Sequence, residues 1–238
     1  MTNKEQIYKF KLEYDKLDSN DFPKLELPQI LLYLNKAQTA TIEQIYDPDD
    51  NKLGFETTQL TMDHLSPIHV KSEPLVPLIV STGNPNEYYF NLSSLSQKYM
   101  HLTRSYSYGT SPVCGSQILD NLVYTSNELN QVLKDPNRKP SFEWQEIPIT
   151  VAQDRGYFYT DGTFTLETVK WEYLREPKEI DMAGYLKFDG SPSIDQDCEF
   201  DNTIAENIIN LALVYAKTTV GDFSGAQATA GAAKLELT

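Results

Sequence analysis

The sequence has few of the features that mark several classes of protein. Its two cysteines, Cys114 and Cys198, lie 84 positions apart with no CxxC pair, so it indicates neither a disulfide framework nor a zinc site. Apolar runs such as Ile30–Leu34 and Leu78–Val80 are far shorter than the ~20 residues of a membrane span. The N-terminal segment has no apolar signal-peptide core. We therefore expect a protein of a cytosol-like compartment with no membrane partner.

Catalytic motifs are also missing. The sequence has no GxSxG, P-loop or GxGxxG pattern, and no cysteine has a plausible histidine partner. His64, His69 and His101 lack metal-ligand spacing, which favours ordinary surface or core positions. Asp and Glu are numerous enough for a paired-carboxylate glycosidase, but no pattern singles out a pair. We therefore expect no enzymatic activity, no catalytic residue, no cofactor and no metal site.

Positive charge is scarce. Lys and Arg number 20 against 34 Asp and Glu, which gives a net charge of −14, and residues 181–238 carry 3 against 9. This acid excess argues against a clamp on a phosphate backbone. It suits a pore through which DNA slides, because like charges repel along the path.

Helical periodicity is strongest over residues 28–46. Pro28 fits a first helical turn, and the Asp-Pro pair after Tyr46 ends the helix at ~18 residues, or ~27 Å. Its mostly apolar stripe comprises Ile30, Leu31, Leu34, Ala37, Gln38, Thr41, Ile42 and Ile45. A second long helix is expected over 203–219, capped by Asp201 or Asn202, with a buried stripe of Ile204, Ile208, Leu211, Ala212 and Tyr215. The two helices are natural packing partners, and a shorter helix is expected over 4–17.

The middle of the chain mixes helical and strand signals. Residues 75–80 predict a short apolar strand, whose proline confines it to a sheet edge or to the start of a strand. Residues 92–102 have helical spacing, and residues 126–133 predict a helix capped by Ser126. Asp161-Gly162 predicts a hairpin turn between strands at 157–160 and 163–166. The apolar phase then changes, which predicts a bulge near Glu167-Thr168.

Two further patterns each allow a functional and a structural interpretation. The acidic run over 195–201 suggests calcium. The EF-hand glutamate position holds Glu206, but the glycine position holds Phe200, which favours cap and loop roles. Four aromatic residues suit either a core or a sugar-binding platform, with a core favoured. They are Tyr157, Tyr159, Trp171 and Tyr173.

Together these patterns predict an α+β fold. Long amphipathic helices, at about 28–46 and 203–219, would pack together with an antiparallel sheet region from the middle of the chain. We expect one domain over 1–222, helical in 1–135 and 200–222 and β-structured at about 140–180. Residues 223–238 are either a frayed end or an extended arm that docks on a neighbour by strand addition or in a groove. Phe223, Leu235 and Leu237 are then the candidate subunit contacts.

Five stretches, in order along the chain, resemble one family, the head–tail connector or neck ring proteins of tailed bacteriophages. The resemblance is closest to those of crAss-like podoviruses of Bacteroidales. The stretches are ILLYLNKAQTATIEQIY, GFETTQ followed by LSPI, VYTSNELNQVLKDPNRKPSF, YTDGTFTLETVKWEYLREPKEID and CEFDNTIAENIINLALVYA. The sequence departs from the family after GFETTQ, where a basic cluster is expected, and in its Ala/Gly-rich tail.

The resemblance implies a structural virion protein made in the host bacterial cytoplasm. Its copies would form a twelve-fold ring that joins portal to tail, contacts adjacent neck and tail proteins, and encloses genomic DNA without sequence-specific binding. The alternative function, motivated by the aromatic residues, is a tail-associated module that binds a glycan or receptor. A hydrolase is the third hypothesis.

Overall fold

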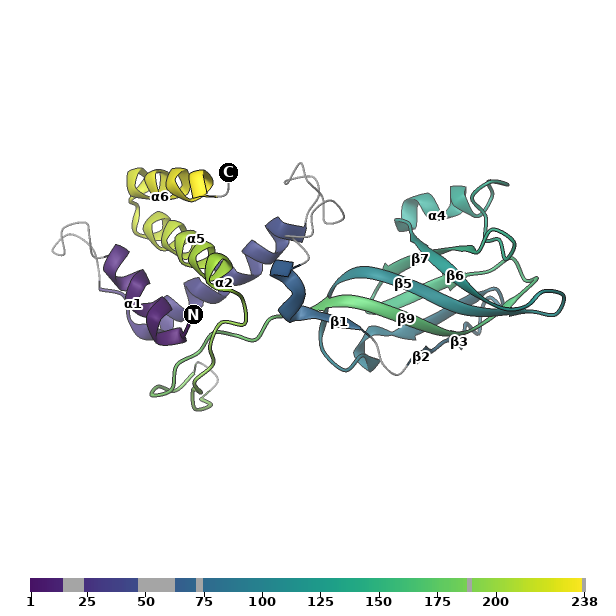
Figure 1. Ribbon diagram of the computed structural model, residues 1–238, viewed down its shortest axis with the longest axis horizontal. Coiled ribbons are helices and arrows are strands. Elements are labelled where there is room, and N and C mark those ends of the chain that lie inside the picture. The colour runs from purple at the N-terminus through teal and green to yellow at the C-terminus, as the bar shows by residue number, and fades with distance from the viewer. Residues whose placement is uncertain (15–23, 47–62, 72–74, 188–189, 237–238) are drawn as a thin grey trace. The chain divides into compact units, whose positions relative to one another are not determined.

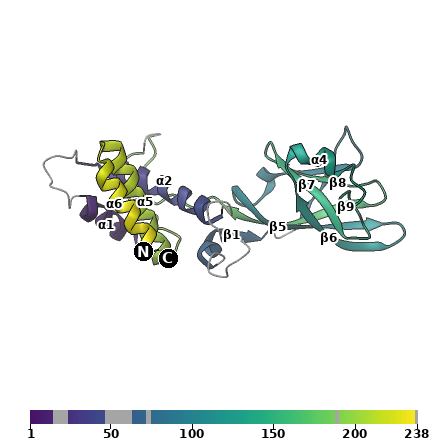
Figure 2. The same ribbon diagram turned by 90° about the horizontal axis from the view of Figure 1, so that it is seen from above.

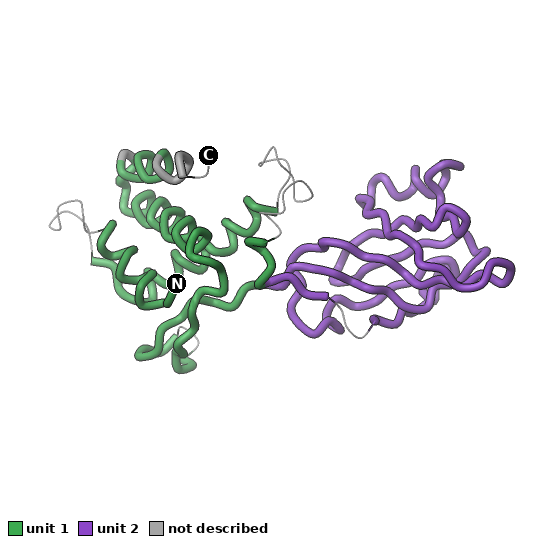
Figure 3. The backbone as a smooth tube through the Cα atoms, viewed as in Figure 1, with its two compact units in different colours: residues 1–67, 177–238 green, residues 68–176 purple. Residues whose placement is uncertain are grey.

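The computed structural model describes all residues except 15–23, 47–62, 72–74, 188–189 and 237–238. The chain forms two compact units, which Figure 3 shows in different colours. The helical unit contains residues 1–67 and 177–238, and the sheet unit contains residues 68–176. The sheet unit is therefore one continuous stretch inserted between the two halves of the helical unit.

The described helices of the helical unit are α1 Asn3–Tyr14, α2 Leu27–Tyr46, α5 Asn202–Val220 and α6 Phe223–Glu236 (Figure 1, Figure 2). A 3₁₀ turn covers Ser66–Ile68 at the boundary between the units. Helix α5 packs against each of the other three helices, and α1 also contacts α2. The predicted first helix and the predicted pairing of the two long helices are both confirmed.

The amphipathic stripe of α2 is buried as its spacing predicts. The buried residues are Ile30, Leu31, Leu34, Ala37, Gln38, Thr41 and Ile42. Ile45 is only half-buried near the helix end. The polar member Gln38 keeps a partner, because its Nε2 donates a hydrogen bond to the Lys178 carbonyl at 3.0 Å. Burial of this face therefore leaves that donor satisfied.

Helix α5 buries more of its surface than one stripe. Its buried residues are Ile204, Ala205, Ile208, Ile209, Ala212, Leu213, Ala216 and Lys217. Leu211 and Tyr215, expected in the stripe, are half-buried. The broader face follows from its contacts with three helices. Asp201 caps the helix, since its carboxylate accepts a hydrogen bond from the Ile204 N–H at 2.9 Å.

The sheet unit holds a nine-stranded mixed sheet. The strands are β1 His69–Lys71, β2 Val76–Pro77, β3 Ile79–Val80, β4 Glu87–Asn91, β5 Tyr99–Ser111, β6 Gly115–Val123, β7 Glu146–Ala152, β8 Arg155–Tyr159 and β9 Thr165–Arg175. The strand order is β1-β9-β5-β6-β7-β8-β4-β3, with β2 also paired to β9. The β6–β7 pair is parallel and the connection between these strands contains α4, Ser126–Val132, whereas the other pairs are antiparallel. A 3₁₀ turn covers Leu92–Ser94.

The sheet curls on itself (Figure 1). β2 pairs with β9, and β3, which follows after Leu78, pairs with β4 at the other end of the strand order. Between them the Leu78 N–H donates to the Glu167 carbonyl at 3.0 Å. The short strand predicted at 75–80 is divided into β2 and β3, which have different partners, and Pro77 lies in β2, which pairs only with β9 among the described strands.

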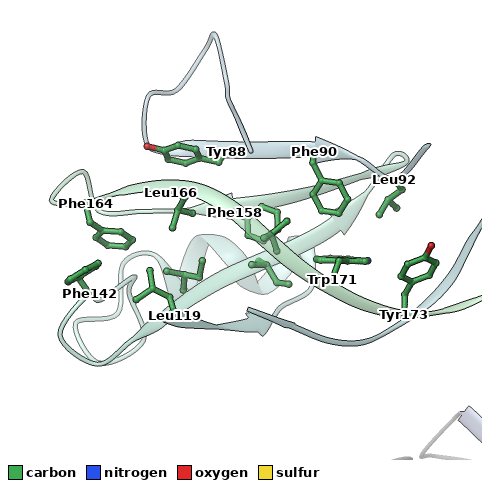
Figure 4. Close-up of a cluster of buried hydrophobic side chains, with 13 residues drawn as sticks. Tyr88, Phe90, Leu92, Leu119, Phe142, Phe158, Phe164, Leu166, Trp171 and Tyr173 are labelled. Carbon is green, nitrogen blue, oxygen red and sulfur yellow. The ribbon is translucent and has the colours of Figure 1, made fainter. Parts of the chain in front are cut away.

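The concave side of the sheet encloses an aromatic core (Figure 4). Trp171 is fully buried, with its ring 5.0 Å from Phe90 and 6.1 Å from Phe158, both with edge-on geometry. Gly156 lies against these rings, and a Cβ there would stand 2.8 Å from the Phe90 ring. The cluster also contains Tyr88, Leu92, Leu119, Phe142, Ile147, Ile149, Phe164, Leu166, Val169 and Tyr173.

The expected fold class is wrong. We expected an antiparallel region at about 140–180 packed with long helices. The structure instead has a curled mixed sheet over residues 69–175, and this sheet has its own hydrophobic core. The described helices, none longer than 20 residues, pack with one another in the helical unit, apart from short α4. The supposedly helical part, 1–135, contains β1 to β6. Strand pairing joins distant segments, so local periodicity did not reveal it.

The helix expected over 92–102 is also wrong, because that stretch leads into β5. The buried positions of β5 hold Ser105, Ser107 and Ser111, while Tyr106 and Tyr108 alternate with them and are half-buried. The usual pattern of apolar residues inside and polar residues outside is thus inverted. This inversion hid the strand from a hydrophobicity pattern.

The predicted hairpin over 157–166 does not form. β8 pairs with β4 and β7, while β9 pairs with β1, β2 and β5. Asp161 instead closes a local turn, since its Oδ1 accepts hydrogen bonds from the Thr163 N–H at 2.9 Å and from its hydroxyl at 2.6 Å. The hairpin turn in this region is at Gln153 and Asp154, where φ is 50° and 64° between β7 and β8.

Two local predictions in this unit had different outcomes. The bulge is confirmed at Glu167, because Tyr108 pairs with Thr168 while Gly109 pairs with Leu166. The cap of α4 is Thr125 rather than Ser126. The Glu128 carboxylate accepts from the Thr125 N–H and hydroxyl, at 3.3 and 2.9 Å, which completes a capping box that begins one residue earlier than expected.

Candidate functional site

The candidate subunit contacts Phe223, Leu235 and Leu237 belong to the C-terminal segment. Residues Phe223–Glu236 form α6, so the expected extended arm is wrong over that range. Phe223 begins the helix and is 66% exposed. For Leu235 the structure describes only the backbone, within α6, and Leu237 lies outside the described residues. The structure therefore leaves one large exposed apolar side chain here as a possible contact.

The segment is helical because its local chemistry favours a helix. Its many alanines have the highest helix propensity, and the Asp222 carboxylate accepts a hydrogen bond from the Gly225 N–H at 2.9 Å. Helix α5 holds α6 through Lys217, whose Nζ donates to the Thr229 hydroxyl at 2.8 Å. The aspartate before an alanine-rich run was the sequence signal for this helix.

The acidic run at 195–201 serves backbone groups, which confirms the cap and loop interpretation. Each of its four carboxylates accepts a hydrogen bond from a backbone N–H. The pairs are Asp195 with Ala183 at 3.0 Å, Asp197 with Asn3 at 2.8 Å, Glu199 with Lys178 at 2.9 Å, and Asp201 with Ile204 at 2.9 Å. The run thereby connects the long loop that precedes α5 to the N-terminus of α1.

A buried carboxylate organises the same loop. Asp181 is 2% exposed, and its oxygens accept hydrogen bonds from four donors. The donors are the Met182 N–H at 2.9 Å, the Tyr185 hydroxyl at 2.8 Å, the Lys187 ammonium at 3.1 Å and the Ile194 N–H at 3.2 Å. Burial acts to raise the pKa of Asp181, but these donors outweigh it and hold the pKa below its ordinary value. The same bond raises the pKa of Lys187. The carboxylate is thus a structural anchor.

This anchored loop presents aliphatic side chains to water. Asp181 pairs with Gln196 and Leu186 pairs with Pro192 as isolated antiparallel bridges, which hold residues 181–187 against residues 190–196. Leu186 is 71% exposed and Ile194 is 60% exposed. Side chains held in place before binding lose little conformational entropy when a partner covers them. Sequence patterns did not single out these two residues.

The histidines and cysteines do not converge on a site. His64 Nδ1 lies 2.9 Å from the Asp201 carboxylate, and His69 Nε2 lies 3.2 Å from the Thr103 hydroxyl. Burial lowers the pKa of His69. Cys114 is exposed after β5 and Cys198 is buried in the helical unit, each as a free thiol. Within the described ranges, no three His, Cys, Asp or Glu side chains come together as a group that could hold a metal ion.

The four aromatic residues of the sugar-platform hypothesis lie in two different environments. Trp171 and Tyr173 are fully buried in the core of the sheet unit, so neither can stack on a ligand (Figure 4). Tyr157 and Tyr159 are half-buried and alternate with the core residue Phe158 along β8. Tyr157 stacks obliquely on Tyr89, with ring centroids 6.3 Å apart. The core interpretation therefore holds for Trp171 and Tyr173.

A small cavity of about 220 Å³ lies in the sheet unit beyond the end of β8. Its lining residues are Asn84, Asn86, Leu133, Lys139, Pro140, Tyr159, Thr160 and Asp161. Burial raises the pKa of Tyr159, whose hydroxyl lies 3.4 Å from that of Thr150. The lining combines amides, one cation and one carboxylate without a nucleophile beside a base, so it suits binding rather than covalent chemistry.

Comparison with known proteins adds no family assignment. No protein-family model matches the chain, and no curated protein matches it. Among the described helices, none is long and apolar enough to cross a membrane.

Proposed function

We propose that this chain is a structural subunit of a ring in the neck of a tailed phage. The observation that carries the proposal is the set of five stretches, in order along the chain, that resemble neck ring proteins. In this role the chain joins the portal to the tail and encloses the DNA channel. The ring would be twelve-fold, as the resemblance implies, and its other partners would be adjacent neck and tail proteins.

The exposed side chains of the 181–196 loop support a role in protein contacts. Exposed aliphatic surface costs about 25 cal/mol per Å² until a partner covers it. Asp181 holds Ile194, and it holds Tyr185 next to Leu186, so little conformational entropy is lost when Leu186 and Ile194 are covered. A ring subunit needs such ready-made contacts, because each copy must bind two neighbours.

The charge of the chain supports a channel role rather than a DNA clamp. The net charge of −14 repels the phosphate backbone. A ring of such chains would let DNA pass with little adhesion, whatever its base sequence.

Two phage experiments test the proposal. A density map of the virion should contain the curled sheet unit and the helical unit as repeated copies in the neck. Particles made without the chain should fail to retain DNA or to attach tails. Normal infectious particles that lack the chain would contradict the proposal.

A solution experiment tests the contact loop. The doubly substituted chain Leu186→Ser/Ile194→Ser should remain folded but bind the portal protein, or other copies, at least about tenfold more weakly. The control is Leu186→Met/Ile194→Val, which keeps the apolar surface and should assemble normally. Light scattering coupled to size exclusion measures both. Equal assembly of the two variants would remove the 181–196 loop from the interface.

A further inference from the structure

The sheet unit carries a compact basic cluster immediately after α4. Lys134, Arg138 and Lys139 are all exposed there, with Asp135 as the single acidic residue among them. No ion pair joins any of the three cations to a carboxylate within the described part of the chain. On a chain with 34 acidic residues, this cluster is a local reversal of charge.

The backbone holds the three cations close together. The Asp135 carbonyl accepts hydrogen bonds from the N–H groups of Arg138 and Lys139, at 3.1 and 2.9 Å. The Asp135 side chain accepts from the Asn137 N–H at 2.9 Å, so its carboxylate is engaged in the turn. The Arg138 guanidinium also lies 6.0 Å from the centre of the Tyr124 ring. The cluster is thus built on a fixed turn.

The cavity beyond β8 adjoins this cluster. Lys139, which belongs to the cluster, lines this cavity together with the adjacent Pro140. Asn84 and Asn86, from the turn before β4, also line it. Asp161 also lines it, but the Oδ1 atom of this carboxylate already accepts hydrogen bonds from the N–H and the hydroxyl of Thr163. Carboxamides beside cations can bind an acidic chain segment. The cations form ion pairs with its carboxylates, and the carboxamides form hydrogen bonds with its backbone.

Of the two units of a second copy, the helical unit carries the larger excess of negative charge. Counted on the sequence, the helical unit has 11 Lys and Arg against 22 Asp and Glu, while the sheet unit has 9 against 12. Two clusters placed face to face would repel each other. A cluster that meets the helical unit of the next copy gains attraction instead, and such head-to-tail contacts can close into a ring.

We propose that residues 134–139 and the adjoining cavity dock an acidic segment of the helical unit of a neighbouring copy. This inference rests on the proposed ring function and names one of its contacts. DNA is a poorer partner for the cluster, because three cations on a chain of net charge −14 make few phosphate contacts against a large repulsion. DNA binding is therefore treated as an outcome that opposes the inference.

The first test reverses the charge of the cluster in the full chain. Lys134→Glu/Arg138→Glu/Lys139→Glu should weaken self-association by about 100-fold, since three pairs are lost at about fivefold each. The matched control, Lys71→Glu/Lys98→Glu/Arg104→Glu, has the same net charge and changes exposed cations elsewhere on the sheet unit. It should stay within about fivefold of the unchanged chain. Sedimentation velocity at low and high salt measures both, with circular dichroism to confirm folding.

The second test identifies the partner surface. Equal amounts of unlabelled and ¹⁵N-labelled chain are treated with a zero-length carbodiimide cross-linker, and mixed-isotope peptides are sought by mass spectrometry. We expect links from Lys134 or Lys139 of one copy to Asp or Glu within 1–67 or 177–238 of the other.

Several results would overturn the inference. These are a monomeric unchanged chain, equal association of the cluster and control variants, links confined to single copies, or a cluster variant that loses only DNA binding. None of these results contradicts the proposed location of the chain in the neck, because the density map of the virion tests that location separately. Conversely, a map without the chain in the neck would reject the proposed function even if the purified copies associate.

Discussion

The helical unit and the sheet unit differ in charge and in chain continuity. The helical unit carries a net charge of −11 and the sheet unit −3, from 11 against 22 and 9 against 12 basic and acidic residues. The helical unit joins two distant stretches of chain, whereas the sheet unit is one stretch. Electrostatic repulsion between like charges should therefore destabilise mainly the helical unit, which also needs both ends of the chain to fold.

The two units also differ in the kinds of residue that they bury. The sheet unit is centred on aromatic side chains such as Trp171, Phe90 and Phe158. The helices α2 and α5 bury aliphatic and small residues, including three alanines of α5. The helical unit adds buried polar anchors such as Asp181. We therefore expect the sheet unit to respond mainly to packing changes, and the helical unit to respond strongly to pH and to changes in hydrogen bonding.

Separating the units should have the largest effect. A fragment of residues 68–176 should fold alone, because it keeps its whole sheet and its aromatic core. Residues 1–67 should stay largely unfolded alone, since the stripe of α2 then lacks α5. Circular dichroism and NMR amide dispersion measure both fragments. An unfolded 68–176 fragment would show that the two units stabilise each other.

Removal of the central core ring should come next. Trp171→Ala should destabilise the sheet unit by about 3–5 kcal/mol and leave the helical unit unchanged. The control is Trp144→Ala, because Trp144 is 55% exposed and loss of its side chain should cost less than about 0.5 kcal/mol. Tryptophan fluorescence follows the sheet unit, because both tryptophans lie in it, and far-UV circular dichroism follows the helices. Loss of both signals together in urea would show that the units unfold cooperatively.

The buried anchor should give the helical unit its sensitivity to acid. Because the pKa of Asp181 is lowered in the folded chain, its stabilisation is fully present above the unfolded pKa of about 4 and is lost as pH falls through the folded pKa. Asp181→Asn should cost about 2 kcal/mol at neutral pH and flatten this acid dependence. Urea unfolding at several pH values measures it. Glu179→Gln, at a 75% exposed side chain, is the control and should keep the acid dependence of the unchanged chain.

The smallest expected effect is at the start of α5. Asp201→Ala removes the cap on the Ile204 N–H and the contact with His64, and should cost the helical unit about 1 kcal/mol. Asp201→Ser, which can still cap, should recover most of that loss. Thermal unfolding followed by helix ellipticity compares them. Equal losses for the two variants would place the effect in the His64 contact instead of the cap.

The sequence predicted best what depends on nearby residues. The buried stripe of α2, the Asp201 cap and the bulge at Glu167 all follow from spacing within a few residues. It predicted the candidate site less well. Phe223 is exposed as a contact residue requires, but the 181–196 loop and the cluster at 134–139 were not identified, because exposure depends on which side chains the rest of the fold covers.

Only the tertiary structure decided how the strands pair and which aromatic residues are buried. Tyr157 and Trp171 look equivalent along the chain, yet one lies half-exposed on β8 and the other in the core. Asp161-Gly162 has the composition of a hairpin turn, but β8 and β9 pair with other strands. Helix signals are local because each backbone bond joins residues four apart. A sheet joins segments tens of residues apart, and the choice among possible partners is made by the whole core at once.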